Sequence, residues 1–267
     1  MFEKLDMAPA DPILGLSAAF KSDNNPQKIN LGVGVYQDDG GKTPILPSVA
    51  EAEERIVSSS TTKSYLAIDG TPEYNRAVQA LLLGQDHEII RSERAVTVQS
   101  PGGTGALRIA GDFLSRHFPS ARLWLSQPTW ANHPKIFQSA GIEVQTYPYF
   151  DSSDNGLDFS SMIEALSNVP AGDVVLLHGC CHNPTGVDPT ANQWEGIADL
   201  AQKIGWLPLV DFAYQGFGDG LEEDAAGLRA LCRSGQELLV ASSFSKNFAK
   251  MNNLEKLNYN ISNSLKS

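Results

Sequence analysis

Six short apolar runs, separated by segments with helical patterns, constrain the fold of this chain more than any other feature. The expected strands are residues 95–99, 122–126, 143–147, 174–177, 207–210 and 238–241. One helix is expected after Pro47, and further helices are expected over residues 73–83, 104–117, 134–140, 160–166, 191–204 and 225–231. Parallel neighbours need crossover connections, and these connections cover the faces of a sheet. The alternation therefore predicts an α/β fold with a mostly parallel sheet between two layers of helices.

Three of these runs end in polar residues. The run over residues 174–177 leads to His178 and Asn183, the run over residues 207–210 leads to Asp211 and Tyr214, and the run over residues 238–241 leads to Lys246. Open α/β sheets bind ligands at the carboxyl ends of their strands. If the three runs are parallel neighbours, we expect an amide, a carboxylate, a phenol and an amine to meet in one crevice. That set can hold an aldehyde cofactor.

Each of these residues also has an ordinary structural interpretation. Lys246 either extends its amine to water or, when partly desolvated, forms Schiff bases with carbonyls. Asp211 either caps a turn or pairs with a cation, for which a protonated ring nitrogen at ~4 Å would give roughly 4 kcal/mol. Tyr214 can be a half-buried aromatic with its hydroxyl at the rim. Ser243 and Ser245 beside the lysine could donate to a phosphate.

A glycine-rich turn over residues 99–107, which includes Gly103 and Thr104, follows one expected strand and opens a helix. Glycines let the backbone approach an anion, and a helix start offers free N–H groups. The pattern is neither GxGxxG nor a Walker loop, so a nucleotide-binding α/β protein is disfavoured. The alternative is a tight turn before a helix.

Two further groups of side chains invite functional interpretations. Trp130, after another strand end, could stack on a flat heteroaromatic ring or be a core tryptophan. The cluster His178, Cys180, Cys181 and His182 suggests zinc. In an extended run, however, alternate residues face opposite ways, so four ligands could not meet one tetrahedral ion. We therefore expect no metal.

Composition narrows the class of protein. The net charge of −11 argues against a nucleic-acid or anionic-membrane partner. We find no signal-peptide pattern and no apolar stretch of about 18 residues. The 3 cysteines are an odd number, which suits reduced thiols. These features predict a soluble protein of the cytoplasm.

In combination, the candidate residues described above and the segments around them resemble the class I pyridoxal-phosphate aminotransferases, in particular the aspartate and aromatic amino acid group. The matching segments, in family order, are residues 31–36, 40–44, 65–70, 101–107, 178–186, 211–217, 220–224 and 241–248. The resemblance implies amino-group transfer between an L-amino acid and a 2-oxo acid. It also implies a large α/β domain with a seven-stranded mixed sheet, a small domain that closes over substrate, and a dimer.

The resemblance implies catalytic roles for three residues, Lys246, Asp211 and Tyr214. Lys246 would carry pyridoxal 5'-phosphate covalently and move protons. Asp211 would pair with the ring nitrogen and keep the ring an electron sink. Asn183 and Tyr214 would bind the phenolic oxygen of the ring, and Trp130 would stack on it.

Other implied roles concern the phosphate, the substrate and a second subunit. The residues expected at the phosphate are Gly103, Thr104 and Ser243. His133 would lie behind Asp211, and Tyr65 would reach the cofactor of the partner. Gly34 would line the substrate site together with Trp130 and Asn183.

The end of the chain departs from the family pattern. We expect residues 1–40 to form an arm and part of the small domain, residues 41–248 an incomplete large domain, and residues 249–267 a weakly structured, divergent tail. Leu254 stands where the family has its phosphate-binding arginine. Losing that donor would cost about 3 kcal/mol, which is about a hundredfold in cofactor affinity.

Several family elements are also expected to be missing after residue 248. They are the antiparallel strand after the lysine, the long interdomain helix, most of the small domain and both arginines that bind the substrate carboxylate. An uncovered sheet edge would favour aggregation. Two interpretations stay open: an aminotransferase whose truncated chain has little turnover, or a non-catalytic chain that binds the cofactor weakly or pairs with an intact subunit.

Overall fold

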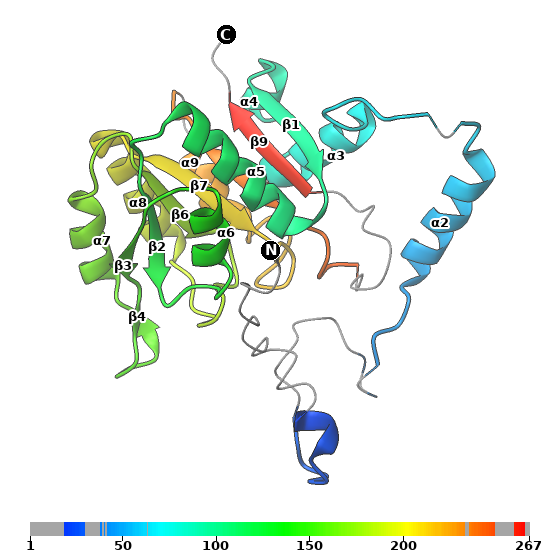
Figure 1. The fold of residues 1–267 in the computed structure, drawn as a ribbon, viewed down its shortest axis with the longest axis horizontal. Coiled ribbons are helices and arrows are strands. Elements are labelled where there is room, and N and C mark those ends of the chain that lie inside the picture. The colour runs from blue at the N-terminus through cyan, green and yellow to red at the C-terminus, as the bar shows by residue number, and fades with distance from the viewer. Residues whose placement is uncertain are drawn as a thin grey trace, which may run out of the picture.

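A mixed sheet forms the centre of the molecule (Figure 1). The computed structural model describes residues 19–29, 38, 40, 42–62, 64–232, 235–248 and 259–264. The sheet comprises β1 (Ala95–Ser100), β2 (Leu123–Gln127), β3 (Val144–Pro148), β6 (Val174–His178), β7 (Leu207–Phe212), β8 (Leu239–Ser242) and β9 (Tyr259–Ser264). Their order across the sheet is β1-β9-β8-β7-β6-β2-β3. A separate hairpin pairs β4 (Phe150–Asp151) with β5 (Gly156–Leu157).

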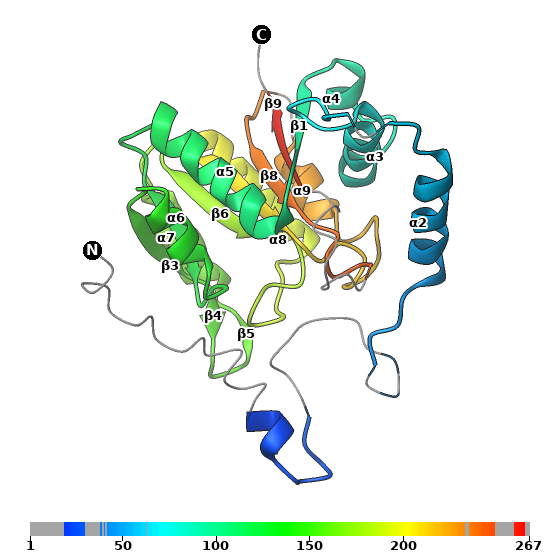
Figure 2. The same ribbon diagram turned by 45° about the vertical axis from the view of Figure 1, so that its right-hand side comes forward.

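Five adjacent strands, β3, β2, β6, β7 and β8, are parallel to one another. This confirms the α/β fold expected from the sequence. One expectation was wrong. The antiparallel strand after the lysine is present, because β9 pairs antiparallel with both β8 and β1 (Figure 2). Its backbone satisfies the hydrogen-bonding groups of two strands that would otherwise each present an open edge. Leu254 and the rest of the tail lie outside the described residues.

Helices cover both faces of the sheet, except α2 (Pro47–Ser59), which buries none of its residues and stands apart from the sheet (Figure 1). The helices are α2, α3 (Pro72–Leu83), α4 (Glu88–Arg91), α5 (Gly102–His117), α6 (His133–Ser139), α7 (Phe159–Ser167), α8 (Ala191–Ile204) and α9 (Ala226–Leu231). Within the described ranges, none of them is long and apolar enough to cross a membrane.

Strand β6 shows how the sequence divides the core between the two faces. Val174 and Leu176 pack in the cluster that contains α5 and α6, whereas Val175 and Leu177 pack in the cluster that contains α3, α7, α8 and α9. Successive side chains of a strand point to opposite faces. A continuous apolar run is therefore the expected sequence of a strand buried on both sides.

Helix α8 begins and ends at recognisable signals. Thr190 and Gln193 form a reciprocal capping box at its start, and Gly205, with φ 88°, ends it in the left-handed conformation. Its buried residues are Trp194, Ile197, Ala198 and Ala201, which lie on one helical face. This face packs against α9.

Packing between α8 and α9 depends on the absence of a side chain at Gly227. A Cβ atom there would overlap the indole ring of Trp194. We expect Gly227→Ala to lower the free energy of unfolding by about 1–3 kcal/mol through overpacking. Gly196→Ala, on α8, is the matched control, because its Cβ would lie 3.8 Å from Phe159. It should raise stability by up to about 1 kcal/mol. Urea unfolding compares the two variants, and equal stability would contradict the packing argument.

Candidate active site

The polar residues that follow β6, β7 and β8 meet at one edge of the sheet, as the sequence predicts. The register pairs His178 of β6 with Asp211 of β7, and Asp211 with Ala241 of β8. All three strands are parallel, so their carboxyl ends lie side by side. The turns after them carry Asn183, Tyr214 and Lys246 to the same edge.

Lys246 lies in the turn after β8 and is partly buried. Its Nζ is 4.9 Å from the centroid of the Tyr214 ring, within the range of a cation–π contact. The Asn183 side chain lies close to the Tyr214 hydroxyl. Burial, with the negative charge of Asp211, raises the pKa of Tyr214. The phenol therefore stays protonated near neutral pH.

Asp211 is ionised and almost enclosed, with its side chain 13% exposed. Its Oδ2 lies 2.9 Å from Nε2 of His133. Burial opposes ionisation, but the hydrogen bond and charge of His133, with smaller effects of His178 and Lys246, hold the pKa of this carboxyl below its usual value. The crevice therefore has a fixed negative charge behind the lysine. His133 lies where the resemblance places it.

Thr129 links the histidines behind Asp211, and sequence reasoning missed it. Its Oγ1 lies 2.8 Å from Nδ1 of His133 and 3.1 Å from Nε2 of His178. Nδ1 of His178 accepts a bond of 3.4 Å from the backbone N–H of Asn183. Burial lowers the pKa of His178 well below its ordinary value. These contacts fix the orientation of the His133 ring. The sequence signal for Thr129 was its place just after a strand end.

His182 is also buried near the site, but it faces structural partners. It stacks on Tyr149 with ring centroids 3.9 Å apart. Its Nε2 lies 2.9 Å from Ser126 Oγ, and its Nδ1 lies 2.8 Å from Thr185 Oγ1. Burial lowers its pKa from 6.5 to about 4.

This shift predicts a loss of stability in acid. Between pH 6.5 and about 4 the unfolded chain takes up a proton that folded His182 cannot hold. The free energy of unfolding should therefore fall as the pH falls through this window, by about 1.4 kcal/mol per pH unit and about 3 kcal/mol in all. Urea unfolding should show a shallower pH slope for His182→Gln, whereas surface variant His117→Gln keeps the wild-type slope. Equal slopes in all three proteins would contradict the assignment.

The start of α5 forms the second wall of the candidate site. Gly103 and Thr104 lie in its first turn, which has no side-chain cap and no acidic residue. Such a helix start is a favourable place for an anion. Ser243 is buried beside it at the end of β8, and its Oγ accepts a 3.3 Å bond from the N–H of Ser245.

Two more hydroxyls lie buried where the strands end. Ser100, the last residue of β1, and Ser242, the last residue of β8, have buried Oγ atoms without a hydrogen-bond partner in the described part of the chain. Buried polar atoms in native proteins are nearly always paired. The turn before α5 and the turn before Lys246 therefore hold spare donors for a ligand.

The remaining predicted residues differ in their placement. Trp130 is partly buried, with its ring edge-on to His133 at a centroid distance of 5.2 Å. Tyr65 is fully exposed on the loop before α3. Gly34 lies outside the described residues.

A mostly parallel sheet covered by helices on both faces, with a lysine opposite a buried acid at its carboxyl edge, defines the large domain of the pyridoxal-phosphate-dependent transferases. Comparisons with known proteins identify the branch. The family model for aminotransferase class I and II matches residues 26–252. The chain belongs to this family.

Relatives in the family agree with the fold. The chain is 56% identical over 252 residues to aspartate aminotransferase of Escherichia coli K12, a match that covers 94% of this chain and 64% of the relative. It is 49% identical to the aromatic-amino-acid aminotransferase of Pseudomonas aeruginosa, over 92% of this chain and 62% of that protein. The crystal structure of the aromatic-amino-acid aminotransferase of Burkholderia pseudomallei, covalently bound to pyridoxal phosphate, superposes with a TM-score of 0.95 at 43% identity, covering 100% of this chain and 66% of that chain. The chain thus spans about 64% of the length of its curated relatives.

Proposed function

We propose that this chain binds pyridoxal 5'-phosphate at the carboxyl edge of its sheet and takes part in transamination between an L-amino acid, aspartate or aromatic, and a 2-oxo acid. The observation that carries the proposal is the placement of Lys246. Its amine lies against the Tyr214 ring and acts electrostatically on the ionised Asp211 carboxylate. The names of the relatives support both classes of amino acid.

The residues present fit this cofactor. A negatively charged carboxylate buried behind the crevice suits a protonated ring nitrogen, because an unpaired carboxylate would be costly there. The start of α5, which has no side-chain cap, and the hydroxyls of Ser100 and Ser242, which have no partner among the described residues, offer donors for a phosphate. Gly103, Thr104 and Ser243 would hold the phosphate, and Trp130 would lie against the ring.

When bound, the cofactor supplies an electron-withdrawing ring that lets the α-carbon of an amino acid lose a proton. The side chains of this chain prepare for that chemistry. Asp211 keeps its negative charge because its hydrogen bond with His133 Nε2 holds the pKa of the carboxyl below its usual value. Tyr214 and Asn183 present a hydroxyl and an amide to the same side of the crevice. Lys246 Nζ is placed to accept a proton and return it.

Release of a 2-oxo acid tests this function. The purified chain, loaded with cofactor, is mixed with L-aspartate or L-phenylalanine, and the oxo acid is measured with a coupled dehydrogenase. Stoichiometric oxo acid from the loaded chain supports transamination. Bound cofactor with no oxo acid from either amino acid contradicts it and favours the non-catalytic alternative.

That alternative, in which the chain pairs with a second subunit, has its own observation. Helix α2 buries none of its residues, and Tyr65 and Ile68 on the following loop are fully exposed. Large apolar side chains exposed close together mark interaction sites. We infer a homodimer in which α2 and this loop contact a second copy of the chain. A cytoplasmic location is part of the proposal, supported by the rice relative named as cytoplasmic.

Self-association should depend on Ile68. Burying an isoleucine gives about 1.5–3 kcal/mol, so Ile68→Asp should weaken the dimer at least about tenfold. Ile109→Asp is the matched control, since Ile109 is an exposed isoleucine on α5. Sedimentation velocity over a concentration series measures both. A monomeric wild type, or equal weakening by both variants, would overturn the inference.

A further inference from the structure

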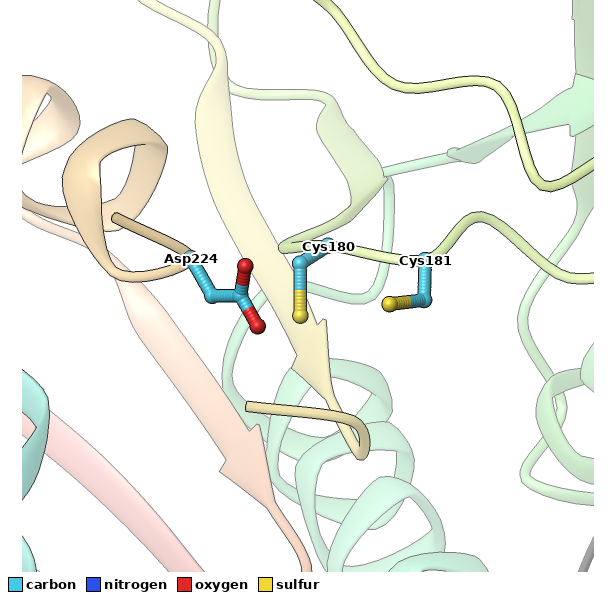
Figure 3. A group of neighbouring side chains, drawn as sticks. All are labelled: Cys180, Cys181 and Asp224. Atoms are coloured by element: carbon cyan, nitrogen blue, oxygen red, sulfur yellow. The ribbon is translucent and has the colours of Figure 1, made fainter. Parts of the chain in front are cut away.

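Two thiols and a carboxylate that have no role in the proposed cofactor site lie together beside the crevice. Among the described residues, Cys180, Cys181 and Asp224 place their ligand atoms within 4.8 Å of one another (Figure 3). The cysteines follow β6, and Asp224 precedes α9. Cys180 and Asp224 are buried, whereas Cys181 is partly exposed. The group is therefore formed by two turns and can be reached from one side.

The backbone at Cys181 explains why adjacent thiols share a side. Side chains alternate only while the backbone is extended. Cys181 has φ 48°, in the left-handed region that non-glycine residues rarely adopt. The turn brings its sulfur back toward that of Cys180, as Figure 3 shows. The premise that these residues alternate was therefore wrong at this position, although it holds within β6.

The neighbouring histidines do not belong to this group. His178 faces Thr129, and His182 is held between Ser126, Thr185 and the Tyr149 ring. A zinc site built from two histidines and two cysteines does not form. The carboxylate of Asp224 stands in their place, from a different turn of the chain.

Asp224 is held in a fixed orientation. Its Oδ2 accepts from the N–H groups of Gly216 at 2.7 Å and Gly218 at 3.0 Å, and its Oδ1 accepts from Asp219 at 2.8 Å. Oδ2 uses both of its lone pairs in these bonds, whereas Oδ1 keeps one lone pair that can bind a cation. Asp188 and Asp219 lie close enough to act electrostatically on Cys181. The local potential is therefore negative and attracts cations.

We propose that Cys180, Cys181 and Asp224 bind a thiophilic divalent cation of the zinc and cadmium class, with water as the fourth ligand. Bond lengths of about 2.3 Å to sulfur and 2.1 Å to oxygen separate the ligands of a tetrahedral ion by roughly 3.5–3.8 Å. The three atoms, which lie within 4.8 Å of one another, must therefore approach by at most roughly 1.3 Å. Thiolate ligands select this class over magnesium or calcium.

A cation here would join the two turns that carry the crevice residues. Asn183 follows Cys181 by two positions, and Tyr214 precedes the loop that Asp224 clamps. The ion would fix the distance between these turns through ligands other than Asn183, Tyr214, Asp211 and Lys246, although the two thiols lie close enough to act electrostatically on Tyr214. Binding should therefore raise stability by mass action, since the unfolded chain holds no preformed site.

Cadmium titration tests the site in the chain without cofactor, so the outcome is independent of the proposed function. The reduced, purified chain is titrated with Cd²⁺, and sulfur-to-cadmium charge-transfer absorption is recorded in the ultraviolet. We expect saturation at one ion per chain. Cys181→Ser and Asp224→Asn should weaken binding at least about tenfold, since each removes one ligand, whereas Cys232→Ser, which removes the third cysteine, should leave it unchanged.

Unfolding of a variant can be distinguished from loss of a cadmium ligand. Cys181 is only partly buried, so Cys181→Ser tests the site even if Asp224→Asn disturbs the loop. Circular dichroism confirms the fold of each variant. The proposal is overturned if Cys181→Ser binds as the wild type does, or if Cys232→Ser abolishes the absorption. Absence of charge-transfer absorption in the folded wild type would also overturn it.

Discussion

Replacing Lys246 with alanine is expected to abolish covalent attachment of pyridoxal 5'-phosphate to the chain. Lys246 is the lysine whose Nζ lies at the crevice, against Tyr214 and within the field of Asp211. The wild-type chain, mixed with cofactor and reduced with borohydride, should gain the mass of one cofactor on the peptide that contains Lys246. In Lys246→Ala this adduct should fall to background.

A surface lysine provides the control. Lys203 lies exposed in the last turn of α8. Lys203→Ala should retain the full adduct, because pyridoxal phosphate reacts only weakly and unspecifically with solvated lysines. An adduct of wild-type yield in Lys246→Ala, found on another peptide, would show that the crevice is not the cofactor site. Loss of the adduct in both Lys246→Ala and Lys203→Ala would also contradict the assignment of Lys246 as the lysine that carries the cofactor.

The strand pattern was predictable because burial on both faces leaves a strong local signature. The apolar run expected over residues 174–177 corresponds to β6 (Val174–His178), and the run over residues 207–210 corresponds to β7 (Leu207–Phe212). Their carboxyl ends were predictable in turn, since parallel strands in one sheet end at the same edge. Asp211 and Lys246 could therefore be placed together from the order of the apolar runs alone.

Three features left no such signature. Strand β9 (Tyr259–Ser264) reads Tyr-Asn-Ile-Ser-Asn-Ser, without an apolar run, and its pairing comes from the open edges of β1 and β8. Thr129 contacts two histidines: His133, at the start of α6, and His178, which is distant in sequence at the end of β6. The left-handed turn at Cys181 is not marked by a glycine or asparagine. Each is decided by tertiary contacts, which override local propensity.

Replacing Asp211 with asparagine should have the second largest effect, on cofactor affinity. The pair of Asp211 with a protonated ring nitrogen at ~4 Å is worth roughly 4 kcal/mol, which corresponds to on the order of a thousandfold in affinity. Asparagine has the same shape and can still contact His133. Equilibrium binding of the cofactor, followed by its absorption, measures the loss. Asp86→Asn, on an exposed turn, should bind as the wild type does.

A merely structural role for Asp211 predicts a different pattern. Because burial itself opposes the charge of Asp211, removing that charge should change the free energy of unfolding far less than the cofactor affinity. A cofactor analogue with carbon in place of the ring nitrogen completes a double-mutant cycle. The wild type should bind the cofactor much more tightly than this analogue, whereas Asp211→Asn should bind the two about equally. If the two proteins discriminate against the analogue to the same degree, the carboxylate does not face the ring nitrogen, and the crevice must hold the cofactor in another orientation.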